Sequence, residues 1–337
     1  MDIKIFVTLG PGSFSKDVIE QIANEFIYLF RINLSHTPIR LIEEQINFVQ
    51  SCTEIPLCLD SEGAQMRNQS MSEGKVLFKK GDIIKIHYDE VVGDSNNISF
   101  TPNHIVNQFR IGDEIAIDFN MARLKIIDQV YNHFVAKVVV GGKVGSNKAA
   151  DLNRKIKMDA ITDKDKEAIK IGRRMGIRNY ALSFAENGED VKLMRELAGN
   201  DVNIISKIES KQGLVNIDNI LDKTNEIIID RGDLSRQILL EKIPFIQRRI
   251  TSQARAKGVP VAVATNLLES MIKNGQPTRA EINDVVSTLL TGATGLVLAA
   301  ETAIGSHPVE SVKMVRTLIN QFERWTPNTT ISELLGY

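Results

Sequence analysis

The stretch "NIISKIE" (residues 203–209) has the pattern of a buried β-strand that ends in charge. Its apolar residues are nearly continuous, and Lys207 and Glu209 stand two positions apart at its end. Because side chains alternate across a strand, these two point to the same side. Nearly continuous apolar strands are typical of a parallel sheet covered on both faces. The stretch therefore predicts one strand of such a sheet, with a cation and an anion at its carboxyl end.

The same strand pattern recurs along the chain, and segments with helical spacing lie between the strands. The predicted strands are residues 4–9, 27–34, 55–60, 180–184, 203–209, 226–230, 259–265 and 295–300. The predicted helices are residues 15–26, 37–50, 162–176, 189–199, 212–222, 239–258, 278–292 and 307–323. Eight alternating units of strand and helix favour an α/β fold, a (β/α)₈ TIM barrel, over an open doubly wound sheet.

Three polar or proline residues predict where helices begin. Ser15 is the expected N-cap of the first helix. Thr37 and Pro38 are the expected cap and first residue of the second helix. Pro308 stands near the start of the last.

About ninety residues after the third strand interrupt this alternation. They hold short alternating strands with Gly-Asp and Gly-Gly turns, which indicates an all-β segment. We expect residues 69–148 to form a small β-barrel domain inserted into a TIM barrel of residues 1–68 and 149–337. An insert after a barrel strand leaves from the end where such barrels have their sites, so the insert is expected to act as a lid.

Bulk composition excludes several classes of partner. The 337 residues carry a net charge of -1, which calls for neither nucleic acid nor an anionic membrane as a partner. Apolar runs such as "GLVLAA" (295–300) are too short to span a bilayer. Cys52 and Cys58 have no metal-type spacing, and no signal peptide is evident, so a reduced, cytoplasmic protein is expected.

Charged or polar residues follow the predicted strands at their carboxyl ends, where a barrel would gather them. They are Arg31, Asn33, Asp60, Ser183, Lys207, Glu209, Arg231, Asp233, Thr265 and Glu301. Glu209 and Asp233 offer the hard oxygen ligands that suit Mg²⁺ or Mn²⁺. Lys207 and Arg31 suit an anion such as phosphate. The alternative for Lys207 is a structural ion pair with a neighbouring carboxylate.

Several motifs, in the same order, resemble those of the pyruvate kinase family over nearly the whole chain. They are "KIFVTLGPGS" (4–13), "FRINLSHT" (30–37), "LDSEGAQMR" (59–67), "IISKIES" (204–210), "DRGDLS" (230–235), "VATNLLESMIKNGQPTRAEINDV" (263–285) and "LAAETAIGSHPVESV" (298–312). The resemblance implies metal-dependent phosphoryl transfer between phosphoenolpyruvate and ADP, giving pyruvate and ATP.

The resemblance also implies roles for single residues at the reacting end of the substrate. Lys207 would stabilise the phosphoryl group in transfer, and Arg31 would contact phosphate. Thr265 would lie beside the carbon that is protonated. The backbone of Gly232 and Asp233 would bind the substrate carboxylate.

Further roles follow from the same resemblance. Ser183 would add to the substrate site, and Glu209 with Asp233 would hold the divalent ion. Asn33, Ser35 and Asp60, with the carbonyl of Ser61, would form a monovalent-cation site, with K⁺ as the candidate. Lys148, Asn33 and Arg67 would contact the nucleotide.

The sequence departs from the family at several of these motifs. Ala299 and Ala300 replace a Ser-Gly pair, Glu62 reverses the charge of a lysine, and Asp230 replaces an alanine. These changes keep a second hypothesis open, namely a divergent relative that uses the same site on phosphoenolpyruvate or another 2-oxo acid with a different acceptor. The family's C-terminal regulatory domain has no counterpart here, so we expect no allosteric activation and a homodimer.

Overall fold

The computed structural model describes residues 3–336, which divide into two compact units. The first unit runs up to Gly63 and resumes at Ala160, and the second is Ala64–Asp159. Each unit has its own hydrophobic core. They are described separately below.

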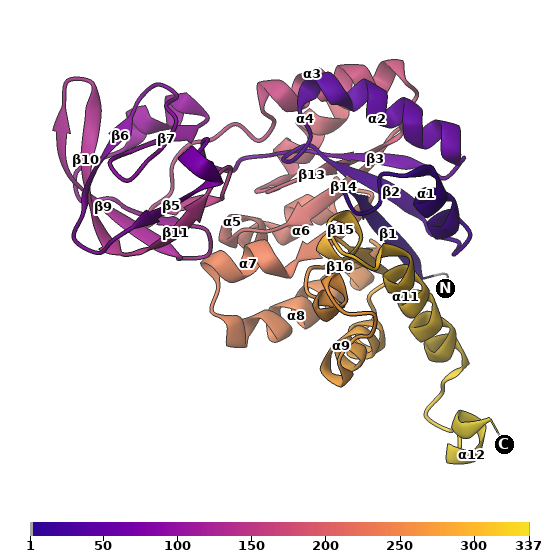
Figure 1. The fold of residues 1–337 in the computed structure, drawn as a ribbon. Coiled ribbons are helices and arrows are strands. Elements are labelled where there is room, and N and C mark those ends of the chain that lie inside the picture. Colours follow the sequence, from indigo (N-terminus) through magenta and orange to yellow (C-terminus); the bar gives the residue numbers. More distant parts are fainter. Residues whose placement is uncertain (1–2, 337) are drawn as a thin grey trace. The chain divides into compact units, whose positions relative to one another are not determined.

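The first unit is a closed barrel of eight parallel strands, in the order β1-β17-β16-β15-β14-β13-β3-β2 (Figure 1). The strands are β1 (Lys4–Leu9), β2 (Leu29–Asn33), β3 (Leu57–Asp60), β13 (Asn179–Leu182), β14 (Asn203–Ile208), β15 (Glu226–Asp230), β16 (Val261–Ala264) and β17 (Gly295–Leu298). The barrel closes where β1 pairs with β17. All eight predicted strands are present, and the predicted α/β TIM barrel is confirmed.

Helices follow the strands and cover the barrel. They are α1 (Lys16–Ala23), α2 (Ile39–Cys52), α3 (Asp163–Arg174), α4 (Gly188–Ala198), α5 (Lys211–Val215), α6 (Ile217–Leu221), α7 (Arg231–Gln237), α8 (Ile243–Ala256), α9 (Arg279–Leu290), α10 (Ala300–Ala303), α11 (Pro308–Arg324) and α12 (Ile331–Leu335). Apolar residues at helical spacing explain the covering. In α2, for example, Ile42, Ile46 and Val49 form one buried stripe against the barrel.

Helix starts agree with the sequence signals only in part. Ser15 does precede α1, but its side chain makes no capping hydrogen bond. The prediction for the second helix is wrong by one residue, because Pro38 is itself the N-cap of α2 and the helix begins at Ile39. Pro308 is the first residue of α11. Proline suits both places because its φ is fixed and it has no N–H to leave unpaired.

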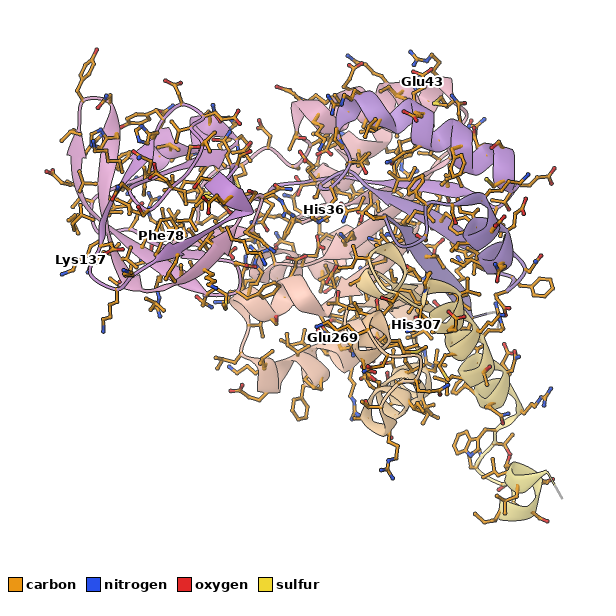
Figure 2. The ribbon with its side chains drawn as sticks, in the orientation of Figure 1. His36, Glu43, Phe78, Lys137, Glu269 and His307 are labelled. Carbon is orange, nitrogen blue, oxygen red and sulfur yellow. The ribbon has the colours of Figure 1, made fainter. Side chains whose placement is uncertain are left out.

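The second unit is all-β apart from two short 3₁₀ turns, at Ser72–Gly74 and Asn103–Gln108. Its strands are β4 (Arg67–Asn68), β5 (Lys75–Phe78), β6 (Ile83–His87), β7 (Asn97–Thr101), β8 (Glu114–Ile117), β9 (Ala122–Val130), β10 (His133–Val140), β11 (Gly142–Gly145) and β12 (Ala150–Leu152). Seven of them form a sheet in the order β12-β8-β9-β10-β6-β7-β4, and β11 pairs with β5. The strands alternate between the buried and exposed faces, as Phe78 and Lys137 illustrate (Figure 2).

The bounds of the second unit are wider than the predicted insert of residues 69–148. The reason is strand pairing at both ends. β4 pairs with β7, and β12 pairs with β8. Both short strands are therefore tied to the sheet of the second unit by hydrogen bonds.

Within residues 3–336, no helix is both long enough and apolar enough to cross a membrane.

Candidate functional site

Four buried, oppositely charged side chains meet at the carboxyl ends of adjacent strands of the first unit. Arg31 comes from β2 and Asp60 from β3, while Lys207 lies in β14 and Glu209 directly follows it. The side chains of all four are less than 10% exposed. Two cations and two anions without access to water require close pairing, since an unpaired buried charge is strongly unfavourable.

Asp60 lies between the two cations. Its Oδ2 atom accepts a hydrogen bond from Nη2 of Arg31 and lies 3.4 Å from Nζ of Lys207. The other guanidinium edge of Arg31 donates to Oγ1 of Thr8, 3.1 Å away. Burial raises the pKa of Asp60, but Lys207 and Arg31 lower it by more, so the net shift is downward. Asp60 therefore stays ionised and fixes both cations.

Lys207 has three oxygen partners. Its Nζ atom lies 3.0 Å from Oγ of Ser183 and 2.9 Å from Oε1 of Glu209, in addition to Asp60. Burial lowers the pKa of Lys207, but the carboxylates of Asp60 and Glu209 more than reverse this, so the net pKa is raised. The ammonium group is thus a permanent, oriented charge.

Ser183 is held in place by its neighbours at the end of β13. Its Oγ atom donates to Oδ1 of Asp60 at 3.2 Å, and its N–H donates to Oγ of Ser61 at 2.9 Å. Gly63 passes so close that a Cβ atom there would lie 2.4 Å from the carbonyl oxygen of Ser183. Gly63 also has a φ of 67°, which favours glycine. This loop therefore requires a glycine at that position.

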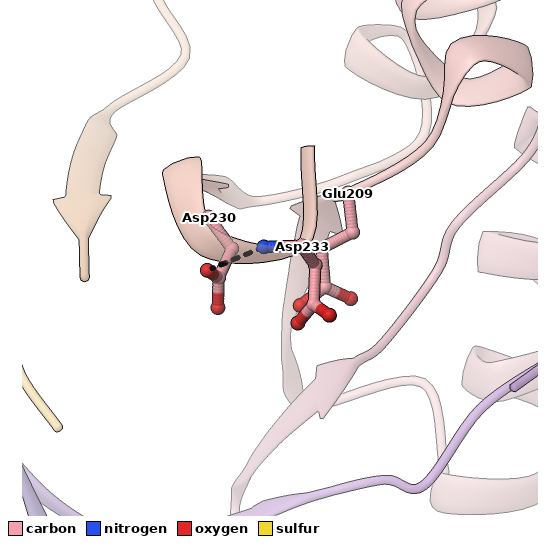
Figure 3. A group of neighbouring side chains, drawn as sticks. All are labelled: Glu209, Asp230 and Asp233. Atoms are coloured by element: carbon pink, nitrogen blue, oxygen red, sulfur yellow. Dashed lines mark hydrogen bonds between the residues drawn. The ribbon is translucent and has the colours of Figure 1, made fainter. Parts of the chain in front are cut away.

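Three carboxylates, of Glu209, Asp230 and Asp233, lie close together (Figure 3). Glu209 among them pairs with Lys207. One oxygen from each lies within 4.8 Å of the others. Oε2 of Glu209 accepts from the N–H of Phe184 at 2.7 Å, whereas its buried Oε1 has no hydrogen bond despite its closeness to Lys207. The donor set and the free lone pairs of Oε1 fit a divalent cation such as Mg²⁺ or Mn²⁺.

The pKa of Glu209 lies well above the ordinary value of a glutamate. Burial raises it to about 8; Lys207 opposes the shift, and Asp233 and Asp230 add to it. Asp233 has a raised pKa as well, through burial and the proximity of Asp230, although Arg236 donates to its Oδ1 atom at 2.6 Å. A bound divalent cation would favour the ionised form of each carboxylate.

Thr265 contacts the Asp230 carboxylate of this group. Oγ1 of Thr265 donates to Oδ1 of Asp230 at 2.6 Å. The same Oδ1 atom accepts from the N–H of Gly232 at 3.2 Å and from that of Asp233 at 3.5 Å. Thr265 has a φ of 76°, a rare conformation for a β-branched residue.

The predicted monovalent-cation ligands are already engaged with the protein. Oδ1 of Asn33 accepts from the N–H of Ser35 at 2.9 Å. Both carboxylate oxygens of Asp60 accept hydrogen bonds, from Arg31 and from Ser183. Lys164 donates to the carbonyl of Leu34 and lies 2.8 Å from Oε1 of Glu62, so a cation of the protein itself lies near this loop.

The two predicted nucleotide contacts of the second unit lie near each other within it. Arg67 donates to the carbonyl of Asn147 at 3.2 Å, and Nζ of Lys148 lies 3.8 Å from Oδ2 of Asp118. The N–H of Lys148 donates to Oδ1 of Asn68, next to Arg67. Both side chains are partly exposed.

Arg231 and Glu301 of the strand-end residues bind groups other than the four buried charges, and the side chain of Asn33 accepts from the N–H of Ser35. The guanidinium of Arg231 binds the carbonyl oxygen of Thr265 and Oδ2 of Asp284 in α9. Glu301 accepts from the N–H groups of Leu268 and Ala299. Each therefore fixes a loop at the end of a strand.

Sequence reasoning missed two members of the site. Thr8 could have been found, because it is a polar residue one position before the end of the first strand and lies opposite Arg31 in the pairing of β1 with β2. Asp230 was noticed only as a departure from a motif. The available signal was its position in the sequence. Asp230 ends β15 and lies between the predicted site residues Glu209 and Arg231.

The comparisons with known proteins agree in one family. The model described as "Pyruvate kinase, barrel domain" matches residues 1–312. A pyruvate kinase of Thermotoga maritima is 32% identical over 330 residues, which cover 95% of this chain and 71% of that protein. One of Methylorubrum extorquens is 32% identical over 95% of this chain and 68% of its own length. A pyruvate kinase of Geobacillus stearothermophilus is also 32% identical, over 95% of this chain and 57% of its own length.

Proposed function

The chain belongs to the pyruvate kinase family, and from this premise we propose that it transfers the phosphoryl group of phosphoenolpyruvate to ADP, giving pyruvate and ATP. The observation that supports this most is the buried ammonium of Lys207. It lies 2.9 Å from Glu209 and beside three clustered carboxylates. Phosphoryl transfer needs mainly positioning and charge stabilisation, and this arrangement supplies both.

Lys207 and Arg31 would carry the positive charge that the transferring phosphoryl group meets. Asp60 and Ser183 hold the Lys207 ammonium in one place, so little reorganisation is needed during the reaction. Arg31 is fixed by Thr8 and Asp60 and contributes a second, always-charged group. Both side chains are buried, where their charges act more strongly than in water.

Glu209 and Asp233 would hold Mg²⁺ or Mn²⁺. That ion would neutralise charge on the phosphoryl oxygens and on the substrate. The N–H groups of Gly232 and Asp233 would bind the substrate carboxylate, with Ser183 alongside. Thr265, on the same side as these N–H groups, would orient the carbon that receives a proton.

For the nucleotide we propose Lys148 and Arg67, which both belong to the second unit. Both side chains of the second unit are cationic and partly exposed, which suits phosphate. K⁺ at Asn33, Ser35, Asp60 and Ser61 is proposed as a second cofactor. Since the side-chain oxygens of Asn33 and Asp60 already accept hydrogen bonds, this ion would have to compete with those donors.

The test is turnover of phosphoenolpyruvate with ADP, Mg²⁺ and K⁺, with pyruvate and ATP measured separately. We expect both products in equal amounts. Consumption of phosphoenolpyruvate without ATP would contradict ADP as the acceptor and support another nucleophile. A parallel reaction with Na⁺ in place of K⁺ tests the monovalent ion.

A homodimer and a cytoplasmic location belong to the same proposal. Light scattering of the purified chain tests the first. Fractionation of the cells that produce it tests the second.

A further inference from the structure

Asp230 ends β15, and its side chain turns back to the start of α7. A single oxygen, Oδ1, accepts from the hydroxyl of Thr265 at 2.6 Å and from the N–H groups of Gly232 and Asp233 at 3.2 and 3.5 Å. Figure 3 draws the bond to Asp233 and shows the Asp230 carboxylate beside those of Glu209 and Asp233. One carboxylate oxygen thus accepts three hydrogen bonds.

Those N–H donors are the ones that the proposed function gives to the carboxylate of the substrate. An N–H group has one hydrogen to donate, so a second carboxylate can use it only if the first one leaves. The second carboxylate would also meet the negative charge of Asp230 at close range, and like charges disfavour each other.

The backbone around these donors has little room to shift. A Cβ atom on Gly232 would lie 2.7 Å from Cγ2 of Thr265. Thr265 in turn has its carbonyl oxygen bound by Arg231, at 3.1 Å from Nε and 2.6 Å from Nη2. The donors therefore keep their direction, and whichever carboxylate is present must fit the same place.

We propose, on the basis of the proposed function, that Asp230 is an internal competitor of the substrate carboxylate and sets the specificity of the site. Its own carboxylate occupies the Gly232 and Asp233 N–H groups and the Thr265 hydroxyl. Phosphoenolpyruvate must displace it and is bound weakly. Phosphate esters without a neighbouring carboxylate do not meet this competition.

A structural reading of Asp230 is that it is an ordinary N-cap of α7. This reading accounts for the bonds to Gly232 and Asp233, since aspartate is a favoured N-cap. It gives no reason for the short bond from Thr265, which lies in the loop after β16. A third reading makes Asp230 a ligand of the divalent ion, because it belongs to the carboxylate group.

The experiment separates these readings by direct binding in the absence of ADP. Phosphoenolpyruvate and vinyl phosphate, which lacks the carboxylate, are titrated calorimetrically into the Mg²⁺-loaded protein. For Asp230→Ala we expect phosphoenolpyruvate to bind at least tenfold more tightly and vinyl phosphate to change less than threefold. Asp230→Asn keeps an acceptor for the N–H groups but loses the charge, and we expect a smaller gain for phosphoenolpyruvate.

Each other outcome would overturn the proposal. If Asp230→Ala binds phosphoenolpyruvate as the wild type does but has a lower melting temperature, Asp230 acts only as the N-cap of α7. If Asp230→Ala binds Mn²⁺ more weakly in the absence of substrate, and also binds phosphoenolpyruvate more weakly, Asp230 is a ligand of the divalent ion. If Asp230→Ala does not fold, the Asn variant decides, because it keeps the cap and must still bind phosphoenolpyruvate more tightly.

The result is independent of turnover. If the wild-type chain makes no ATP but Asp230→Ala binds phosphoenolpyruvate more tightly, the proposed function fails and the competition stands. If ATP forms and the affinity is unchanged in both variants, the function stands and the competition is refuted.

Discussion

Oδ2 of Asp60 lies 3.4 Å from Nζ of Lys207, and the same oxygen accepts a hydrogen bond from Arg31. One buried carboxylate therefore compensates two cations that come from strands on either side of it in the barrel. Removing its charge would leave Arg31 and Lys207 facing each other without an anion between them.

Asp60→Asn is therefore expected to destabilise the protein by about 3–5 kcal/mol, as for other broken buried ion pairs. Urea unfolding followed by circular dichroism measures the change. Glu43→Gln is the matched control, because the pair of Glu43 with Arg174 is exposed and such pairs contribute about 0–1 kcal/mol. Glu43 lies on the outer helix α2 (Figure 2). Equal effects of the two substitutions would contradict the role given to Asp60.

Lys207→Met should lower turnover by about 10²–10³ or more, since a preorganised charge next to the transferring group is lost. The steady-state rate with phosphoenolpyruvate and ADP measures it. The substitution also leaves Glu209 buried without its cation, so stability should fall. Lys207→Met combined with Glu209→Gln should recover part of the stability but none of the activity. Turnover near the wild-type rate in the single variant would refute the assignment of Lys207.

Divalent-cation binding should depend on Glu209. Mn²⁺ is expected to raise the melting temperature of the wild-type protein, because it binds the folded carboxylate group, and at a hundredfold excess over Kd the gain is about 2.7 kcal/mol. Glu209→Gln should remove most of this effect. Asp218→Asn, at an exposed carboxylate that pairs with Lys257, is the control and should leave it unchanged. The same Mn²⁺ effect in Glu209→Gln would rule out Glu209 as a ligand.

Acid should weaken the start of α9 through Glu281. Burial raises the pKa of this carboxylate, but hydrogen bonds from Ser270 and Thr278 lower it by more, and the net shift is below 4.5, its ordinary value. Because the pKa of Glu281 is lower in the folded than in the unfolded protein, its ionised carboxylate stabilises the fold at pH values above the unfolded pKa. This stabilisation is lost as the pH falls through the folded pKa.

The Glu281→Gln variant should accordingly be less stable than wild type at pH 7 by about 1–2 kcal/mol, because its amide cannot accept all four hydrogen bonds. The difference should shrink as the pH falls below 4.5. Thermal unfolding across pH 2–7 tests this. Glu310→Gln, in the first turn of α11, is the control. A difference that persists unchanged at the lowest pH would contradict the prediction.

The barrel could be predicted because its strands are nearly continuous in apolar residues and all but the third lead directly into a helical segment. "EIIID" (226–230) became β15 with the predicted bounds. The pairing of the second unit could not be predicted, since it joins strands far apart in sequence, such as β12 with β8 and β4 with β7. Alternation tells which face is buried, but it does not tell which strands are neighbours.

For the site, the sequence identified the charged residues but not all of their partners. Lys207 and Glu209 were found from their spacing on a single strand. The bond between Asp230 and Thr265 joins residues 35 positions apart, and no local sequence pattern indicates it.

The pairing of β1 with β17 also constrains how the chain folds during synthesis on a ribosome. One edge of β1 stays without its partner until residues 295–298 have emerged, although residues 29–33 can pair with the other edge early. By then Arg31, Asp60, Lys207 and Asp230 have all been translated. The nascent barrel therefore exposes an open strand edge for most of its synthesis, and this edge can recruit a chaperone or a neighbouring nascent chain.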